Sequence, residues 1–260
     1  MSKNILLTFD LEEFDLPREY NIPIEKEEQL HISTQGLKSV LDLLEPYHIK
    51  ATFFTTAFYA DKNRDLIKAI SNKHEIASHM CFHSNYEPDH ILESKKVLEE
   101  ITGGKINGFR MPLLKKVELM QLKNAGYTYD SSINPTFIPG RYNNLFTPRR
   151  YYKDLKTDLF VLPFSVSPIF RIPLFWLSFK NFNFSFYRHL CKITMQKDNY
   201  LHLYFHPWEF TDLSSFKIPG YIKRFSGTIF IKHFEKLLIF LNQNGEFNTI
   251  NNFLMNQGNF

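Results

Sequence analysis

The sequence predicts an α/β protein, a (β/α) barrel of about seven or eight parallel strands. The length of 260 residues suits one such domain, covering residues 1–260. Short apolar runs alternate along the chain with segments of helical periodicity, which is the pattern of a parallel sheet. Acidic and basic side chains repeatedly follow the apolar runs. Such side chains are expected where barrel strands end, because those ends meet at one rim.

Apolar runs rich in strand-forming residues predict the strands. The first, NILLTF, is apolar throughout, as expected for a strand buried on both faces, and Asp10 is predicted to end it. Later runs such as ATFFTT and YLHLYF are rich in β-branched and aromatic residues. The expected strands are residues 4–9, 51–56, 74–78, 105–109, 127–132, 158–166, 200–205 and 246–250.

Between these runs, apolar residues recur at helical spacing. Gly126 should end one of the resulting helices in a left-handed conformation. Residues 134–156 form a long excursion, and Pro168 and Pro173 argue against one regular helix over residues 167–182. The expected helices are residues 33–47, 63–71, 89–101, 115–125, 185–196 and 228–242.

Composition narrows the class of protein. The net charge of +4 does not indicate a nucleic-acid partner. Cys81 and Cys191 form neither a disulfide framework nor a CxxC site. The N-terminus turns acidic after a few apolar residues, so no signal peptide is expected, and no apolar stretch is long enough to span a bilayer. These features predict a cytoplasmic protein.

Candidate functional residues fall at the C-terminal ends of the predicted strands. They are Asp10, His79, Arg110, Asp130 and His206. In a (β/α) barrel these ends converge on the rim where catalysis occurs. A chance distribution would scatter such residues over helices and over both ends of the strands.

The stretch HEIASHMCFH predicts part of a metal site. His79 and His83 are four residues apart, and at the start of a helix this spacing places both imidazoles on one face. Together with Glu12 they form a set of two histidines and one carboxylate, which suits divalent Zn, Co, Fe or Mn. The alternatives are two half-exposed loop histidines and a solvated acidic loop at FDLEEFD.

The remaining rim residues suit acid–base chemistry. Asp10 could accept a proton from a water molecule that the metal activates, and Arg110 could keep Asp10 ionised through a charge-assisted hydrogen bond. His206 could protonate a leaving amine. These groups are the components needed to hydrolyse an amide.

The motifs TFDLEEF, HEIASHMCFH, GFRMP, YDSSI and LHLYFHPWEF resemble those of the polysaccharide deacetylase family, also called the NodB-homology or carbohydrate esterase 4 family. The resemblance spans residues 4 to about 210. It implies a distorted (β/α) barrel and metal-dependent removal of an N-acetyl group from an amino sugar, with zinc as the expected metal. By this resemblance Asp10 is the base, Arg110 supports it, His206 is the acid, and His79 and His83 bind the metal.

The sequence departs from the family pattern at several positions. The first motif of the family has two adjacent aspartates, whereas here Leu11 intervenes and Glu12 is the candidate ligand, with Glu13 as the alternative. This FD-x-E form resembles a subgroup that includes allantoinase-like enzymes. The sequence Asp130-Ser-Ser replaces an Asp-Trp motif. The residues predicted to contact substrate are Asp130, Trp208 and Phe14.

The leading functional hypothesis is deacetylation of an amino sugar in a glycan or in a lipid-linked precursor. The alternatives are an allantoinase-like small-molecule C–N hydrolase and a non-catalytic sugar-binding barrel. The aromatic segment 167–184 either completes the barrel core or contacts a sugar or the cytoplasmic membrane face. The membrane hypothesis predicts weak liposome binding that depends on Phe175 and Trp176. Sequence patterns leave the oligomeric state open.

Overall fold

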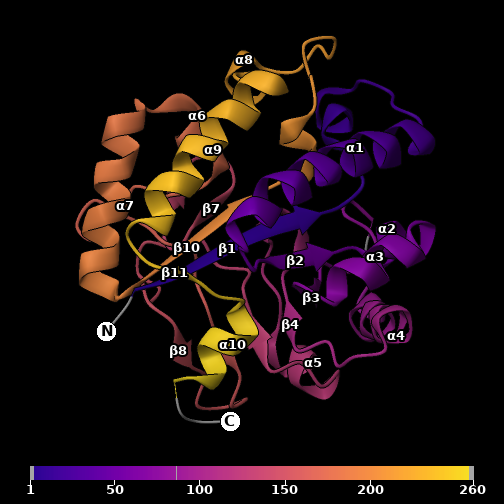
Figure 1. Ribbon diagram of the computed structural model, residues 1–260. Helices are drawn as coiled ribbons and strands as arrows, with labels where there is room; N and C mark the ends of the chain where they lie inside the picture. The colour runs from indigo at the N-terminus through magenta and orange to yellow at the C-terminus, as the bar shows by residue number, and fades with distance from the viewer. Residues whose placement is uncertain (1–2, 86, 258–260) are drawn as a thin grey trace.

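The computed structural model describes residues 3–85 and 87–257, and its centre is a curled, largely parallel sheet (Figure 1). The nine-stranded sheet follows the order β10-β1-β2-β3-β4-β5-β9-β8, with β11 also paired to β1. Every pairing in this sheet is parallel except β8 with β9. The curled parallel sheet forms a half-barrel, which confirms the predicted (β/α) architecture.

The strands of this sheet are β1 (Asn4–Leu11), β2 (Thr52–Thr55), β3 (Glu75–Ser78), β4 (Gly108–Phe109), β5 (Tyr129–Asp130), β8 (Tyr152–Lys153), β9 (Phe160–Val161), β10 (Tyr200–Phe205) and β11 (Glu246–Phe247). The predicted excursion contains a small antiparallel hairpin, formed by β6 (Phe137–Ile138) and β7 (Tyr142–Asn143). Strand β1 extends two residues beyond its predicted end, so Asp10 lies within the strand instead of after it. Strand β10 has the predicted bounds.

The helices are α1 (Lys26–Leu44), α2 (Ala57–Lys62), α3 (Arg64–Ser71), α4 (His90–Thr102), α5 (Leu119–Asn124), α6 (Trp176–Asn181), α7 (Phe184–Asp198), α8 (Gly220–Lys223), α9 (Thr228–Asn242) and α10 (Ile250–Met255). Helices α1 and α9 lie beside each other over the central strands, and α7 packs against β10 (Figure 1). Short 3-10 helices include η1 (Leu16–Tyr20), η2 (Glu45–Tyr47), η3 (Pro112–Leu114) and η4 (Pro207–Phe210).

Helix boundaries differ from the predicted ones where apolar periodicity is weak. Helix α1 begins at Lys26 instead of residue 33, and its first turn contains two glutamates that interact favourably with the helix dipole. Helix α2 was not predicted; the Thr56 hydroxyl caps it by accepting a hydrogen bond from Tyr59 N. Gly126 has φ 82°, which confirms the predicted left-handed end of the preceding helix.

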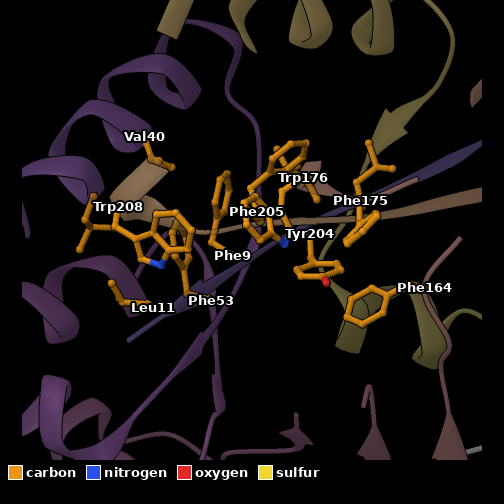
Figure 2. Close-up of a cluster of buried hydrophobic side chains, with 14 of the residues drawn as sticks. Phe9, Leu11, Val40, Phe53, Phe164, Phe175, Trp176, Tyr204, Phe205 and Trp208 are labelled. Atoms are coloured by element: carbon orange, nitrogen blue, oxygen red, sulfur yellow. The ribbon is translucent and has the colours of Figure 1, made fainter. Parts of the chain in front are cut away.

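Aromatic side chains fill the core between the sheet and the helices that cover it. Phe9 of β1 stacks on Phe53 of β2 with ring centroids 5.2 Å apart, and Phe205 of β10 lies beside them (Figure 2). All three side chains are fully buried. Each contributes about 1.5–3 kcal/mol to the stability of the fold through removal of apolar surface from water.

The predicted membrane contact through Phe175 and Trp176 is wrong. Their side chains are only 8% and 9% exposed, and they lie with Tyr204 in the aromatic cluster of Figure 2. Exposed apolar side chains of this segment include Ile169 and Phe170. No helix among the described residues is both long and apolar enough to cross a bilayer.

Candidate active site

Two adjacent strands carry the polar side chains of the site. Successive side chains of a strand point to opposite faces, so residues two apart share a face. Strands β1 and β10 are paired in parallel register, with Thr8 opposite Tyr204. On the shared face, β1 and the residue after it carry Thr8, Asp10 and Glu12. On the same face, β10 and the residue after it carry His202, Tyr204 and His206.

The structure brings Glu12, His79 and His83 together. The Nε2 atoms of His79 and His83 lie 3.1 Å and 3.3 Å from Oε2 of Glu12. All three residues are buried, and one ligand atom from each lies within 4.8 Å of the others. Two imidazoles and a carboxylate converging on one point form a donor set suited to a divalent metal.

The histidine pair reaches this arrangement through a loop. His79 directly follows β3, and no helix connects it to His83, so the expected start of a helix is wrong. Met80 has φ 66°, a left-handed conformation that is uncommon outside glycine and that turns the chain sharply. The two imidazole rings then lie with their centroids 5.9 Å apart.

Contacts behind the imidazoles orient both rings. Nδ1 of His79 donates to the carbonyl oxygen of Arg110 at 2.9 Å, and Nδ1 of His83 bonds to Oδ1 of Asp15 at 2.7 Å. Such contacts leave each Nε2 directed at the point where a metal would bind. Asp15 was not among the predicted site residues, although it lies in FDLEEFD, three residues after Glu12.

The electrostatics of this cluster favour a cation. Burial lowers the pKa of His83, but the Glu12 charge, the Asp15 hydrogen bond and the Asp15 and Glu13 charges outweigh it and raise the pKa to about 10. A group of buried carboxylates that holds a proton this strongly also attracts a divalent ion.

The geometry separates the two candidate glutamates. Glu13 accepts hydrogen bonds from the Thr56 hydroxyl and from the backbone N–H of His83, both at 2.9 Å. The Glu13 carboxylate therefore holds the loop that carries His83. The Glu12 carboxylate instead faces both imidazoles and accepts a hydrogen bond from Nε1 of Trp208 at 3.3 Å.

This difference predicts opposite behaviour for two matched variants. Glu12→Gln should lower zinc affinity by at least about 100-fold, since loss of a ligand exceeds the usual effect of losing a supporting contact. Glu13→Gln should bind zinc in a 1:1 ratio while unfolding at a lower temperature. Metal titration followed by calorimetry measures both. Stoichiometric zinc in Glu12→Gln and none in Glu13→Gln would reverse the assignment.

Arg110 and Asp10 form a buried ion pair beside the cluster. Arg110 is fully buried, its Nη1 donates to Oδ1 of Asp10, and its Nη2 donates to the Thr8 and Ser131 hydroxyls at 3.1 Å and 3.0 Å. Burial raises the pKa of Asp10, but Arg110, His79 and His206 outweigh it and lower the pKa. Asp10 is therefore ionised at neutral pH.

His202 completes this network and was missed in the sequence. Its Nδ1 donates to the carbonyl oxygen of Pro163 at 3.1 Å, so its Nε2, 3.2 Å from Nη2 of Arg110, acts as an acceptor. Burial and the charge of Arg110 lower the pKa of His202 well below its ordinary value, which keeps the ring neutral. The available signal was the spacing of four residues between His202 and His206, which places both side chains on the same face of a strand.

His206 lies on the other side of Asp10. Its Nε2 is 4.0 Å from Oδ2 of Asp10, and its Nδ1 is 3.1 Å from Oε1 of Glu209. The same Oε1 accepts the backbone N–H of His206 at 2.8 Å, and Trp208 stacks on the imidazole with ring centroids 4.7 Å apart. Burial lowers the pKa of His206, but the Glu209 hydrogen bond and nearby carboxylates raise it overall.

One cavity of about 320 Å³ joins these groups. Asp10, Glu12, His79, His83 and His206 all contribute to its lining. Its remaining walls are largely aromatic or aliphatic and include Phe175, Trp176, Leu177, Tyr204, Trp208, Ile138 and Tyr142. In the segment expected either to complete the core or to contact a ligand, Phe175 and Trp176 pack in the core and also line this cavity.

Two predicted substrate contacts are not in this cavity. Phe14 is fully buried and packs behind Trp208, with ring centroids 5.3 Å apart, so it supports Trp208 instead of meeting a ligand. Asp130 lines a neighbouring cavity of about 650 Å³ and accepts a hydrogen bond from the Ser132 hydroxyl. Burial raises the pKa of Asp130 to about 6. Trp208 does line the site cavity, as a substrate contact requires.

A family model matches the N-terminal part of the sequence. Residues 2–129 match the family model described as polysaccharide deacetylase. Over these residues, which are just under half of the chain, the sequence is similar to the polysaccharide deacetylase family. The match covers β1 through β4 and ends at the first residue of β5, so it includes the candidate metal ligands and Arg110. No curated protein matches the chain.

Solved structures share the polysaccharide deacetylase fold over most of the chain. A probable polysaccharide deacetylase from Pseudomonas aeruginosa PAO1 is 16% identical, with a TM-score of 0.65, and the match covers 94% of this chain and 86% of that one. The PuuE allantoinase is 14% identical, with a TM-score of 0.64 and coverage of 96% and 88%. A putative polysaccharide deacetylase from Mycobacterium smegmatis is 17% identical, with a TM-score of 0.58 and coverage of 91% and 85%. At these identities the likeness concerns the fold alone.

Proposed function

We propose that this chain is a metal-dependent hydrolase that removes an N-acetyl or related acyl group from an amino sugar, in a glycan or a lipid-linked precursor. The observation that carries the proposal is the buried set of Glu12, His79 and His83, which shares one cavity with Asp10 and His206. The match of residues 2–129 to the polysaccharide deacetylase model supports deacetylation as the reaction.

The donor set fits a divalent metal. Both histidines use Nδ1 for contacts with Arg110 O or Asp15, so both Nε2 atoms can act as ligands together with Oε2 of Glu12. Three protein ligands leave positions open for water and substrate, and zinc is the first candidate. When bound, such an ion polarises the acyl carbonyl and makes water more acidic.

The other residues then divide the proton transfers. Asp10, held ionised by Arg110, would accept the proton of the attacking water. His206 would donate a proton from Nε2 to the departing amine, because Glu209 holds its Nδ1 on the opposite side. The separation of 4.0 Å between Asp10 and His206 leaves both groups directed at the same small volume.

The cavity walls favour a ring-shaped substrate. Trp176, Trp208, Tyr142 and Tyr204 supply aromatic surface of the kind that packs against sugar rings. The volume of about 320 Å³ is near the lower limit of ligand pockets, which suits one sugar ring with its acyl group.

A second candidate is an allantoinase-like hydrolase of small ureides. The FD-x-E motif and the shared fold with PuuE allantoinase favour it. A non-catalytic sugar-binding barrel is a weaker candidate, because a binding protein has no need of Asp10, Arg110 and His206 beside a metal-ligand set.

A substrate panel decides among these candidates. Zinc-loaded protein should release amine or acetate from N-acetyl amino sugars and should leave ureides such as allantoin unchanged. Amine formed from the sugars is followed with an amine-reactive fluorophore, ring opening of the ureides, which frees no amine, is followed by chromatography, and metal content is measured in the same samples. Turnover of ureides alone would establish the second candidate. Full zinc occupancy without turnover of either class would favour the binding protein.

A further inference from the structure

A buried lysine lies behind the proposed acid. Lys180 belongs to α6 and is fully buried, which is rare for lysine unless its charge is paired. Its Nζ lies 3.2 Å from Oε2 of Glu209, which is also fully buried, and donates to the carbonyl oxygen of Ile222 at 2.9 Å. Aromatic rings surround the ammonium, with centroids 4.8–5.8 Å from Nζ; they belong to Trp176, Trp208 and Phe230.

The two carboxylate oxygens of Glu209 face different partners. Oε2 faces Lys180, while Oε1 accepts the backbone N–H of His206 at 2.8 Å and lies 3.1 Å from its Nδ1. Lys180, Glu209 and His206 thus form a continuous buried chain that ends at the cavity, where His206 faces Asp10.

Such an ion pair is not needed for stability. Replacing a buried pair with apolar residues of similar volume is often neutral or stabilising, whereas removing one partner leaves an uncompensated charge. The surrounding aromatic rings would accommodate an apolar side chain equally well. A role in the chemistry of His206 accounts for the pair better than packing does.

The charge of Lys180 has a definite consequence for His206. A donor imidazole must exist in both protonated and neutral forms during turnover, and Glu209 must stay ionised in both to hold Nδ1–H. With Lys180 present, the Glu209 charge is balanced even when His206 is neutral. Without Lys180, only a protonated His206 would balance it. The other charges facing His206, those of Asp10 and Glu12, are independent of Lys180.

We propose that Lys180 is a positioning residue for His206 and acts through Glu209. This inference rests on the proposed function and assigns a role to the aromatic segment: α6 carries the residue that keeps the acid able to release its proton. Lys180 itself does not line the site cavity.

The test compares Lys180→Met with a matched variant elsewhere. Lys95 is also a buried lysine, paired with Glu99 at 2.9 Å on α4, and it does not line the site cavity. Lys180→Met should lower kcat for an N-acetylglucosamine oligomer by about 100-fold, as expected for impaired general acid catalysis. It should change kcat for p-nitrophenyl acetate only a few-fold, because nitrophenolate leaves without protonation. Lys95→Met should leave both kcat values unchanged. His206→Ala removes the acid itself, so its loss of kcat on the amide is the largest that Lys180→Met could show.

A spectroscopic measurement keeps the inference independent of activity. In ¹⁵N-histidine NMR of the metal-free protein, the midpoint of His206 titration should rise in Lys180→Met, because a nearby positive charge is lost. The double variant Lys180→Met/Glu209→Gln removes both charges and guards against misfolding of the single variant. It should recover thermal stability without recovering amide hydrolysis.

The outcomes separate the two proposals. An unchanged His206 titration in Lys180→Met, or equal losses on the amide and the aryl ester, would reduce Lys180 to a packing residue. Wild-type protein inactive on every amide would overturn the proposed function, while the NMR comparison would still decide the role of Lys180.

Discussion

Replacing His79 or His83 with alanine should remove the bound divalent metal and abolish hydrolysis while the fold survives. Each variant loses one of three ligands, so zinc affinity should fall by at least about 100-fold. The fold should persist because the two residues follow β3 in a loop, and the core of Phe9, Phe53 and Phe205 is untouched. Metal analysis of the purified proteins and circular dichroism measure the two effects.

His74 offers the matched control for these variants. It lies just before β3, at the opposite end of the strand from His79, and its Nδ1 accepts the backbone N–H of Ala51 at 3.3 Å. His74→Ala should keep stoichiometric zinc. Full zinc occupancy in both His79→Ala and His83→Ala would refute the assignment of these residues as ligands.

Asp10→Asn should bind zinc normally but lose turnover by about 100-fold or more, which is typical of a lost general base. The structure adds a second effect. Arg110 is fully buried against Asp10, so the variant leaves an uncompensated guanidinium charge and should lower the free energy of unfolding by about 3–5 kcal/mol. Zinc titration, amide hydrolysis and urea denaturation measure the three quantities.

Asp158→Asn provides the same chemical change at an exposed ion pair. Its side chain is 73% exposed and pairs with Lys153, so stability should hardly change. A different result at Asp10 would revise the site: if Asp10→Asn loses metal and regains near-normal activity at high zinc, then Asp10 is a ligand and Glu12 has another role.

The sequence alone determined the alternation of strands and helices and which residue types stand at the strand ends. Strand β10 and helix α9 have the predicted bounds, because their apolar patterns reflect burial along a single element. The positions of His79, Arg110 and His206 followed from the same logic, since each directly follows a strand. Asp10 was predicted to follow its strand, but β1 continues two residues beyond the predicted end and contains it, because a charged side chain does not necessarily end a strand.

Only the tertiary structure decided how these residues meet. Glu12 contacts His79 across 67 residues of sequence and Trp208 across 196. Strand alternation places Glu12 on the face of Asp10 and Glu13 on the opposite face, but it does not show which side chains meet that face. The convergence of His79 and His83 depends on the left-handed turn at Met80, which helical spacing does not anticipate.

The aromatic segment shows the same limit. Its composition suits a membrane surface as well as a core, because hydrophobicity does not say what a side chain packs against. The surrounding sheet and helices bury Phe175 and Trp176, so these side chains belong to the core and do not form a membrane surface. The burial of Lys180 could not be predicted either, because a lysine in a sequence is normally a surface residue, and its partner Glu209 is brought to it only by the packing of α6 against η4.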